Sequence, residues 1–314
     1  MVELIPPGTN IDFSRFYRYT IIGSILLLVF GLALPITLGI NYGIDFSGGT
    51  LVHLRFAKPI DIGELRSALG SLSEGESGVQ DFGGTGNEFL VRLPESDPDL
   101  RKNLAEQIRQ RLSEKFGEKS EFEVLRVESV GPRVGRDLRR KALLAVAAAT
   151  LAMGIYIAIR FDYRFGIGAA VALLHDVLVV FVFLCLFGYE FDLTTVAALL
   201  TVVGFSVNDN VVISDRIREN MRKNRREPFP SLLNRALNET LSRTVLNSGS
   251  AIIVALTLFA LGGEMIRGFA FALVIGFTIG TYSSIFITSP IVLYLGRVAP
   301  AGGAVAARGR TARS

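Results

Sequence analysis

Residues 204–216 read Gly-Phe-Ser-Val-Asn-Asp-Asn-Val-Val-Ile-Ser-Asp-Arg, and they place the ionisable Asp209 in an apolar run that begins near Leu193. A carboxylate inside a membrane-spanning helix is costly unless it is paired or hydrated. Asn208 and Asn210 flank it and are candidates to hydrate or clamp it. We therefore interpret Asp209 as a functional residue, and the remainder of the chain as the structure that places it and connects it to the outside of the membrane.

The composition is that of a membrane protein. The chain of 314 residues is 50% hydrophobic and has a mean hydropathy of +0.42, which is too apolar for a soluble enzyme of this size. Apolar runs of roughly 20 residues recur, and each can cross a hydrocarbon core about 30 Å thick. Residues 43–131 hold 11 Lys and Arg against 16 Asp and Glu, while the remainder is basic. This distribution argues against a nucleic-acid partner and for the lipid bilayer.

The pattern predicts a polytopic α-helical membrane protein with six transmembrane helices and one exported α+β domain between the first two. A cleaved signal peptide is the competing interpretation of the first run, which is long for an h-region and lacks a clean cleavage site. The predicted parts are a leader at 1–18, spans at 19–40, 138–159, 165–187, 193–213, 244–261 and 269–295, the exported domain at 41–137, a basic loop at 214–243, and a disordered tail at 296–314.

The domain between the first two spans is predicted to have the order β-α-β-β-α-β of a ferredoxin-like unit, with both helices on one face of the sheet. The second helix has Asp97 as its N-cap and Gly117 at its end. Gly131 to Gly135 form a Gly/Pro segment that suits a hinge into the membrane. The expected strands are Thr50–Phe56, Val79–Phe82, Glu88–Leu93 and Phe122–Val130, and the expected helices are Asp61–Leu69 and Asp97–Phe116.

The distribution of Lys and Arg predicts the orientation. These residues gather between spans two and three, between spans four and five, and in the tail, whereas the opposite loops, 188–192 and 262–267, are short. By the positive-inside rule both termini are cytoplasmic and the domain is exported. A basic cluster at 136–141 disagrees, but charges attached to a long translocated domain contribute little to orientation.

Other polar residues in the spans have two interpretations each. His175 and Asp176 are either half of a proton path or an interhelical hydrogen bond that fixes packing, and the residue types alone do not separate the two. Arg243 is the candidate cation for Asp209, although the residues alone favour an ordinary interfacial anchor. Asn247 is a further candidate to hydrate the site, and Asp215 and Arg216 are expected to be solvated.

The remaining motifs predict packing rather than chemistry. Gly276, Gly280 and Ser284 form a small-residue ridge on the sixth span, which lets a neighbouring helix approach closely. The single Cys185 excludes an intrachain disulfide and a thiolate metal site. The sequence holds no phosphate-binding loop, nucleophile elbow or HExxH motif, so we expect neither an enzyme nor a metal or cofactor.

Five motifs, in this order and topology, resemble those of the SecD/SecF family of protein-export membrane proteins, within the RND superfamily, and match its SecF branch. They cover nearly the whole chain except the leader and the end of the tail. They are 43–50 (Gly-Ile-Asp-Phe-Ser-Gly-Gly-Thr), 130–135 (Val-Gly-Pro-Arg-Val-Gly), His175-Asp176, 204–220 and Ser242-Arg243-Thr244.

The resemblance implies a role that composition does not give. Such a chain pairs with SecD, associates with the SecYEG channel, with YajC and YidC as further candidate partners, and acts after the SecA motor on an unfolded preprotein. It uses the proton-motive force at the cytoplasmic (inner) membrane of a prokaryote. The family's essential Asp corresponds to Asp209 and its functional Arg to Arg243, and Asp176 and His175 have a supporting place. The signature and hinge residues of the exported domain are Asp45, Gly48, Gly49, Gly131, Pro132 and Gly135.

Two other classes of function remain open. A proton-driven RND-type exporter of a small molecule or lipid would normally need a second six-span half and a larger exported domain. A structural assembly subunit would leave all proton chemistry to SecD, although an Asp placed in the bilayer at such cost argues against it.

Overall fold

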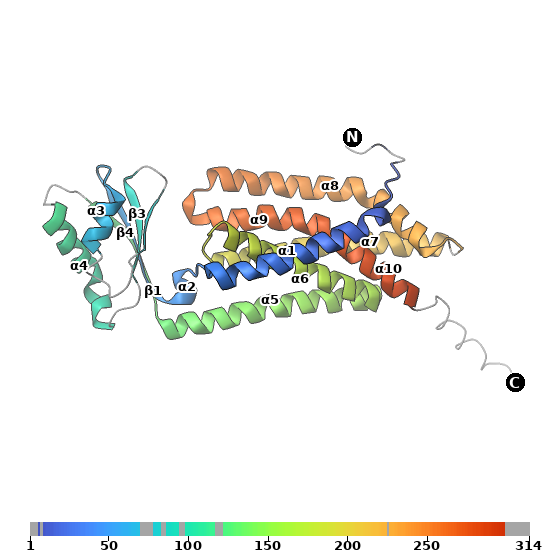
Figure 1. Ribbon diagram of the computed structural model, residues 1–314, viewed down its shortest axis with the longest axis horizontal. Helices are drawn as coiled ribbons and strands as arrows, with labels where there is room; N and C mark the ends of the chain where they lie inside the picture. The colour runs from blue at the N-terminus through green and yellow to red at the C-terminus, as the bar shows by residue number, and fades with distance from the viewer. Residues whose placement is uncertain are drawn as a thin grey trace.

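The computed structural model describes residues 6, 9–69, 78–82, 86–93, 98–116, 122–224 and 226–298. The long helices form a bundle, and a small sheet domain sits at one end of it (Figure 1). We call the end of the bundle at the sheet domain the near end and the opposite end the far end. The first bundle helix begins and the last one ends at the far end (Figure 1).

Within the described residues, six helical segments are long and apolar enough to cross a membrane, as predicted. In the third, fourth and sixth, 56% of the most apolar window is buried, against 11–22% in the others. The helix that carries Asp209 therefore lies at the centre of the bundle. The segments are α1 (Tyr17–Leu38), α5 (Pro132–Arg160), α6 (Tyr163–Leu186), α7 (Leu193–Lys223), α8 (Phe229–Leu261), and a sixth made of α9 (Glu264–Ser283), the π-helical turn η3 (Ser284–Thr288) and α10 (Ser289–Val298).

The prediction of a loop at 214–243 is wrong. Helix α7 continues to Lys223 and α8 already begins at Phe229, so only residues 224–228 connect them. Hydropathy registers the apolar part of a helix, whereas the helix itself continues as long as its backbone groups are bonded. Both extensions are amphipathic and pack on each other, burying Ile217, Leu233 and Leu237.

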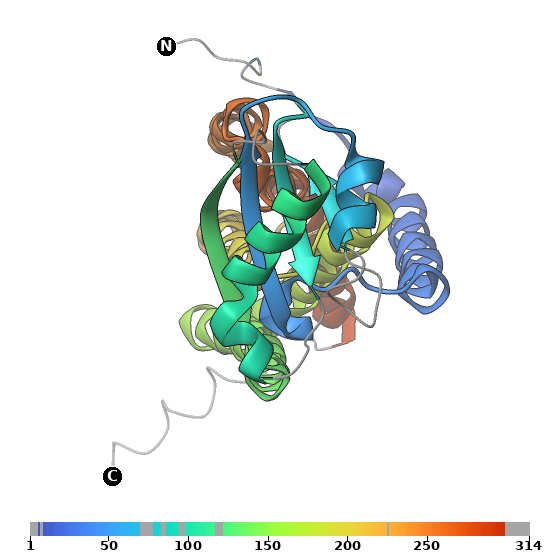
Figure 2. The same cartoon turned by 90° about the vertical axis from the view of Figure 1, so that its left-hand side faces the viewer.

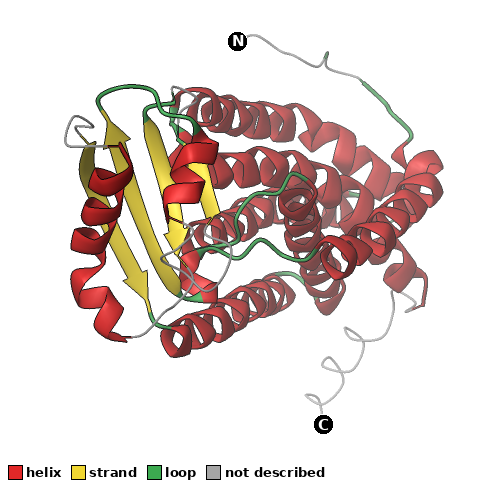
Figure 3. Ribbon diagram, turned by 60° about the vertical axis from the view of Figure 1, so that its left-hand side comes forward, coloured by secondary structure: helices red, strands yellow, loops and turns green. Residues whose placement is uncertain are grey.

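The sheet domain has the predicted ferredoxin-like topology. Its strand order is β2-β3-β1-β4, with every neighbouring pair antiparallel. Helices α3 and α4 cover the face that points away from the bundle (Figures 1, 2 and 3). The elements are β1 (Gly49–Phe56), α3 (Ile62–Leu69), β2 (Gly78–Asp81), β3 (Glu88–Leu93), α4 (Pro98–Phe116) and β4 (Phe122–Val130).

Alternation along the strands builds the core of this domain. Val52, Leu54 and Phe56 of β1 are buried against α3 and α4, while His53 and Arg55 point to the other face, where both pair with Glu88. Asp61 caps α3, as predicted, by accepting from the backbone N–H groups of Gly63 and Glu64. The predicted caps of α4, Asp97 and Gly117, lie outside the described residues.

Residues 131–135, which the sequence suggests as a hinge into the membrane, form the start of a helix. Gly131 is the extended N-cap of α5, and the helix begins at Pro132. A Cβ on Gly135 would lie 3.2 Å from the backbone O of Asp45 and 3.2 Å from the backbone N of Gly48. The signature after the first span, carried on the short helix α2 (Ile44–Ser47), therefore packs directly on the first turn of α5.

The leader is also more ordered than a polar leader implies. Residues Phe13–Phe16 form a 3₁₀ turn, η1, and Phe13 is buried against Phe286. The Asn234 side chain of α8 accepts from the Phe13 N–H, and Asn238 accepts from the Ile11 N–H. The leader therefore docks on the far-end part of α8. The predicted tail beyond residue 298 lies outside the described residues.

Candidate functional site

Asp209 lies on α7, where it is 2% exposed and faces α8. The Ser248 hydroxyl of α8 donates to Asp209 Oδ2 at 3.2 Å, and Asn247 lies beside the same carboxylate. Arg243 is within electrostatic range of Asp209 but forms no ion pair with it. Asp209 is therefore a buried carboxylate that contacts neutral polar side chains of α8, while the cation Arg243 of the same helix lies farther away.

A cavity of about 640 Å³ separates α5 from α7 and α8 on the far-end side of Asp209. Asn208 and Arg243 line it, and it continues along α7 to Arg216. Arg243 is exposed. The cavity therefore extends from the polar extensions of α7 and α8 to Asn208, the residue next to Asp209.

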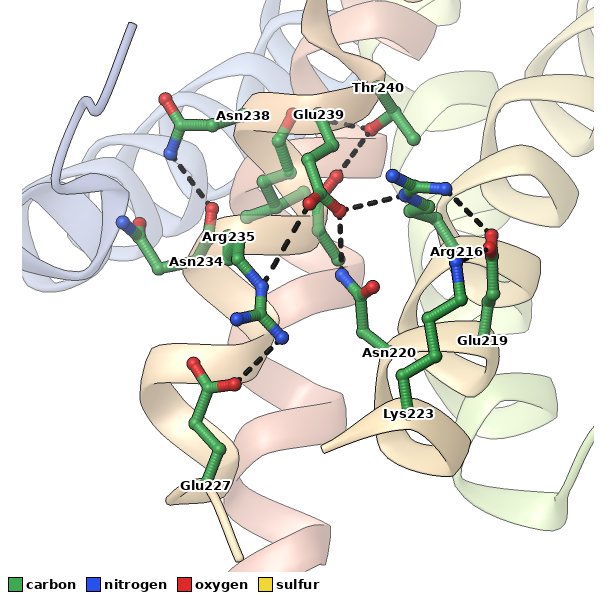
Figure 4. Close-up of polar contacts among 12 residues, drawn as sticks. Arg216, Glu219, Asn220, Lys223, Glu227, Asn234, Arg235, Asn238, Glu239 and Thr240 are labelled. Atoms are coloured by element: carbon green, nitrogen blue, oxygen red, sulfur yellow. Dashed lines mark hydrogen bonds and ion pairs between the residues drawn. The ribbon is translucent and has the colours of Figure 1, made fainter. Parts of the chain in front are cut away.

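A polar network, part of which lines this cavity, ties the extensions of α7 and α8 together (Figure 4). Arg216 Nε lies 2.7 Å from Glu239 Oε2, and Arg216 Nη1 lies 2.7 Å from Glu219 Oε2. Asn220 Nδ2 donates to the same Glu239 oxygen at 2.6 Å. Arg216, which is expected to be solvated, is partly exposed, and its guanidinium also bridges two helices.

His175 and Asp176 belong to a second polar group, which contacts α7 through Ser206 and does not include α8. Asp176 is 0% exposed. The hydroxyls of Ser206 and Ser283 donate to Asp176 Oδ2 at 2.7 and 2.9 Å, and His175 Nδ1 lies 3.3 Å from Oδ1. A carboxylate that accepts this many bonds from α6, α7 and α9 holds three central helices together.

Asn210 extends this second group to the π-helical turn. Its Nδ2 donates to the backbone O of Ser206 at 3.0 Å, and its Oδ1 accepts from the Thr288 hydroxyl at 2.6 Å. Thr288 ends η3, and π-helical turns inside α-helices occur often at functional sites. Asn210 therefore clamps α7 to the sixth segment and does not face Asp209's partners on α8.

We expect the two serine hydroxyls that donate to Asp176 to stabilise the protein by more than one typical intramembrane hydrogen bond does. Ser206→Ala combined with Ser283→Ala leaves a fully buried carboxylate short of both hydroxyl donors, which we expect to cost about 2 kcal/mol or more. The measurement is the midpoint of thermal unfolding of the purified protein in detergent. Ser250→Ala is the matched control, since Ser250 bonds only to a backbone oxygen of its own helix. Equal midpoints for the double variant and the control would contradict the assignment.

The structure thus divides the predicted site residues into three groups. Asp209, Asn247, Asn208 and Arg243 gather between α7 and α8, whereas His175, Asp176 and Asn210 face α6 and the sixth segment. The signature residues lie far from both, at the near end: Asp45, Gly48, Gly49, Gly131, Pro132 and Gly135.

Sequence reasoning missed the hydroxyl donors, namely Ser206, Ser248, Ser283 and Thr288. Serine and threonine are common in membrane helices, so only their helical spacing from an Asp could have indicated them. The predicted small-residue ridge does pack on α7. A Cβ on Gly276 would collide with a Val202 methyl, and a Cβ on Gly280 would lie 3.2 Å from Ser206 Cβ.

Two family models match the chain. Residues 110–298 match the C-terminal model described as "Protein export membrane protein SecD/SecF", and residues 33–60 match the model of the SecD/SecF GG motif. The GG match covers the signature that packs on α5, and the longer match covers α5 to α10.

Curated relatives are similar over almost their whole length. The protein translocase subunit SecF of Calditerrivibrio nitroreducens is 44% identical over 293 residues, which are 93% of this chain and 96% of that protein. That of Magnetococcus marinus is 44% identical over 94% of both chains. That of Vibrio alginolyticus is 38% identical over 94% of this chain and 93% of its own.

Solved structures give the same relationship. The crystal structure of SecDF, a translocon-associated membrane protein from Thermus thermophilus, has a TM-score of 0.80 and 38% identity over 92% of this chain. SecDF in its super-membrane-facing form has a TM-score of 0.68 and 38% identity over 95% of this chain. This chain spans only 39% and 40% of the length of those two SecDF chains.

Proposed function

The chain belongs to the SecD/SecF family of protein-export membrane proteins, and we propose that it is an accessory subunit of the Sec translocase that couples proton movement to late preprotein translocation. It acts as a non-enzymatic subunit, without a cofactor, and protons are the coupling ion. Its partner is a second six-span protein of the SecD type, since the similar SecDF chains are more than twice as long as this one. The SecYEG channel, and the SecA motor that acts before it, complete the proposed system.

The observation that supports proton coupling best is the placement of Asp209. A buried carboxylate with one neutral hydroxyl donor, beside a cavity that reaches the far end, can exist in both protonation states without losing its partner. Protonation removes its attraction to Arg243 and so changes how α7 packs on α8. We place the far end, with its basic extensions, on the cytoplasmic side of the inner membrane, and the sheet domain outside.

The test of this function is translocation of a reporter preprotein into inverted membrane vesicles from cells depleted of the chain. Restoring the chain is expected to restore the stimulation that an imposed proton gradient gives, while the part of translocation that depends on ATP alone changes little. If restoring the chain raises both parts equally, a scaffold for SecD describes it better. Gradient-driven release of a lipid or small molecule by the same vesicles, without any effect on the preprotein, would favour an RND-type exporter.

A further inference from the structure

The connection between α6 and α7 is bonded to the segment that leads into the sheet domain. Phe191 N–H donates to the Asn41 carbonyl at 2.7 Å, and Gly43 N–H donates to the Phe191 carbonyl at 3.0 Å. The Phe191 ring also packs on the ring of Phe46 in the signature, with centroids 5.8 Å apart. A Cβ on Gly43 would lie 2.9 Å from Asp192 Cβ, so the two segments approach as closely as their side chains permit. The two backbone hydrogen bonds form a parallel β-bridge between these segments.

The signature residue Asp45 bonds directly to the first residue of α7. Its Oδ2 accepts from the backbone N–H of Leu193 at 3.0 Å. Asp192 and Thr195 form a capping box at the same helix end, and Asp45 satisfies one more of the N–H groups that a helix leaves unbonded there. Two carboxylates at a helix N-terminus are also favoured by the helix dipole. Asp45 therefore attaches the signature to α7, the helix that carries Asp209.

An ion pair between Arg92 and Glu190 gives the sheet a second attachment to this connection. Arg92 projects from β3 on the face of the sheet that the two domain helices leave uncovered, and its Nη1 also donates to the Tyr42 carbonyl at 3.2 Å. Burial raises the pKa of Glu190, and the Arg92 guanidinium opposes that rise. Asp45 and Asp192 also raise the pKa of Glu190, and Arg126 and Arg267 line the same cavity as Glu190.

We propose that Asp45, Arg92 and Glu190 are positioning residues that carry movements of α7 to the sheet domain. This inference rests on the proposed function. Leu193 lies 16 residues before Asp209 on one unbroken helix, about 24 Å along its axis. A shift of α7 at Asp209 therefore reaches Asp45 without passing through any loop, and Arg92 turns that shift into a change in the orientation of the sheet.

The first test is a charge exchange in the complete complex, read as the ratio of gradient-stimulated to unstimulated translocation. Arg92→Glu and Glu190→Arg are each expected to reduce the stimulation about fivefold or more, and the double exchange is expected to restore at least half of it. Arg126→Glu is the matched control. Arg92, Glu190 and Arg126 all line a cavity of about 560 Å³, but Arg126 pairs with Glu128 on its own strand, so Arg126→Glu should keep the wild-type ratio.

The second test asks whether a covalent link between positions 92 and 190 can replace the ion pair. In a Cys185→Ser background, Arg92→Cys with Glu190→Cys is joined by a short bifunctional maleimide. The cross-linked protein is expected to keep its gradient stimulation, whereas the same variant without cross-linker is expected to lose it. Loss of stimulation on cross-linking, or wild-type stimulation in Arg92→Glu, would overturn the proposal.

The outcome for Asp209→Asn separates this inference from the proposed function. If Asp209→Asn abolishes the stimulation but Arg92→Glu and Asp45→Ala leave it intact, proton coupling stands and the positioning role fails. If Asp209→Asn leaves the stimulation intact, the proposed function itself fails. Co-purification of SecD with each variant shows that a loss of stimulation is not a loss of assembly.

Discussion

Asp209→Asn is expected to abolish the stimulation of preprotein translocation by a proton gradient while leaving the complex with SecD intact. Asparagine keeps the size of the side chain and an oxygen that accepts from Ser248, so packing between α7 and α8 should survive. It removes the negative charge and, with it, the ability to bind and release a proton. One charge that crosses 100 mV releases about 2.3 kcal/mol, which corresponds to roughly a 50-fold shift of a two-state equilibrium.

The measurement is reporter translocation into inverted vesicles with and without an imposed gradient. Asp137→Asn is a suitable control, because Asp137 is exposed on α5 at the near end. It makes the same chemical change outside the site and should behave as wild type. Stimulation that survives unchanged in Asp209→Asn would make Asp209 a packing residue.

Gly48→Ala is expected to disrupt the attachment of the sheet domain to the bundle. Gly48 has a φ of +78°, and a Cβ there would lie 2.9 Å from Pro132 Cα, a backbone atom that cannot rotate away. The backbone conformation of Gly48, with φ +78° and ψ 170°, is essentially restricted to glycine and costs about 1–3 kcal/mol for alanine. Forcing an atom into a packed contact adds about 1–3 kcal/mol. We therefore expect Gly48→Ala to destabilise the attachment by about 2–6 kcal/mol.

Gly39→Ala isolates the conformational part of this effect. Gly39 has the same φ of +78°, but a Cβ there meets nothing within 4 Å. Gly39→Ala should therefore carry only the smaller cost. The measurement is the rate at which a protease cleaves between the sheet domain and α5 in the folded protein. Equal rates for the two variants would show that the packing of the two signatures contributes nothing.

The sequence alone predicted the spans and the sheet domain because both depend on local patterns. Each of three predicted features depends on residues that are close together in the sequence: the apolar runs, the alternation in β1 and the Asp61 cap. The structure agrees with all three. The helical extensions at 214–243 could not be predicted from hydropathy. They depend on pairs between helices, such as Arg216 with Glu239.

The residues that surround Asp209 were harder to predict from the sequence than Asp209 itself. Asp209 stands out in the sequence because an acid in an apolar run is rare, whereas Ser248 is an ordinary residue whose role depends on how α8 packs. Asn208 and Asn210 are equivalent neighbours in the sequence, yet one lines the cavity beside Arg243 and the other bonds to Thr288. Consecutive residues point about 100° apart on a helix, and only the packing of the bundle decides which neighbour each one meets.

The most direct test of the central claim is an infrared measurement of the protonation of Asp209 itself. Difference spectra of the purified complex are recorded as the pH is lowered, with Asp209→Asn as the reference. A carboxylic acid band that appears on acidification in the wild type and is missing in Asp209→Asn is the expected result. Identical difference spectra for the two proteins would contradict the claim that Asp209 binds and releases the coupling proton.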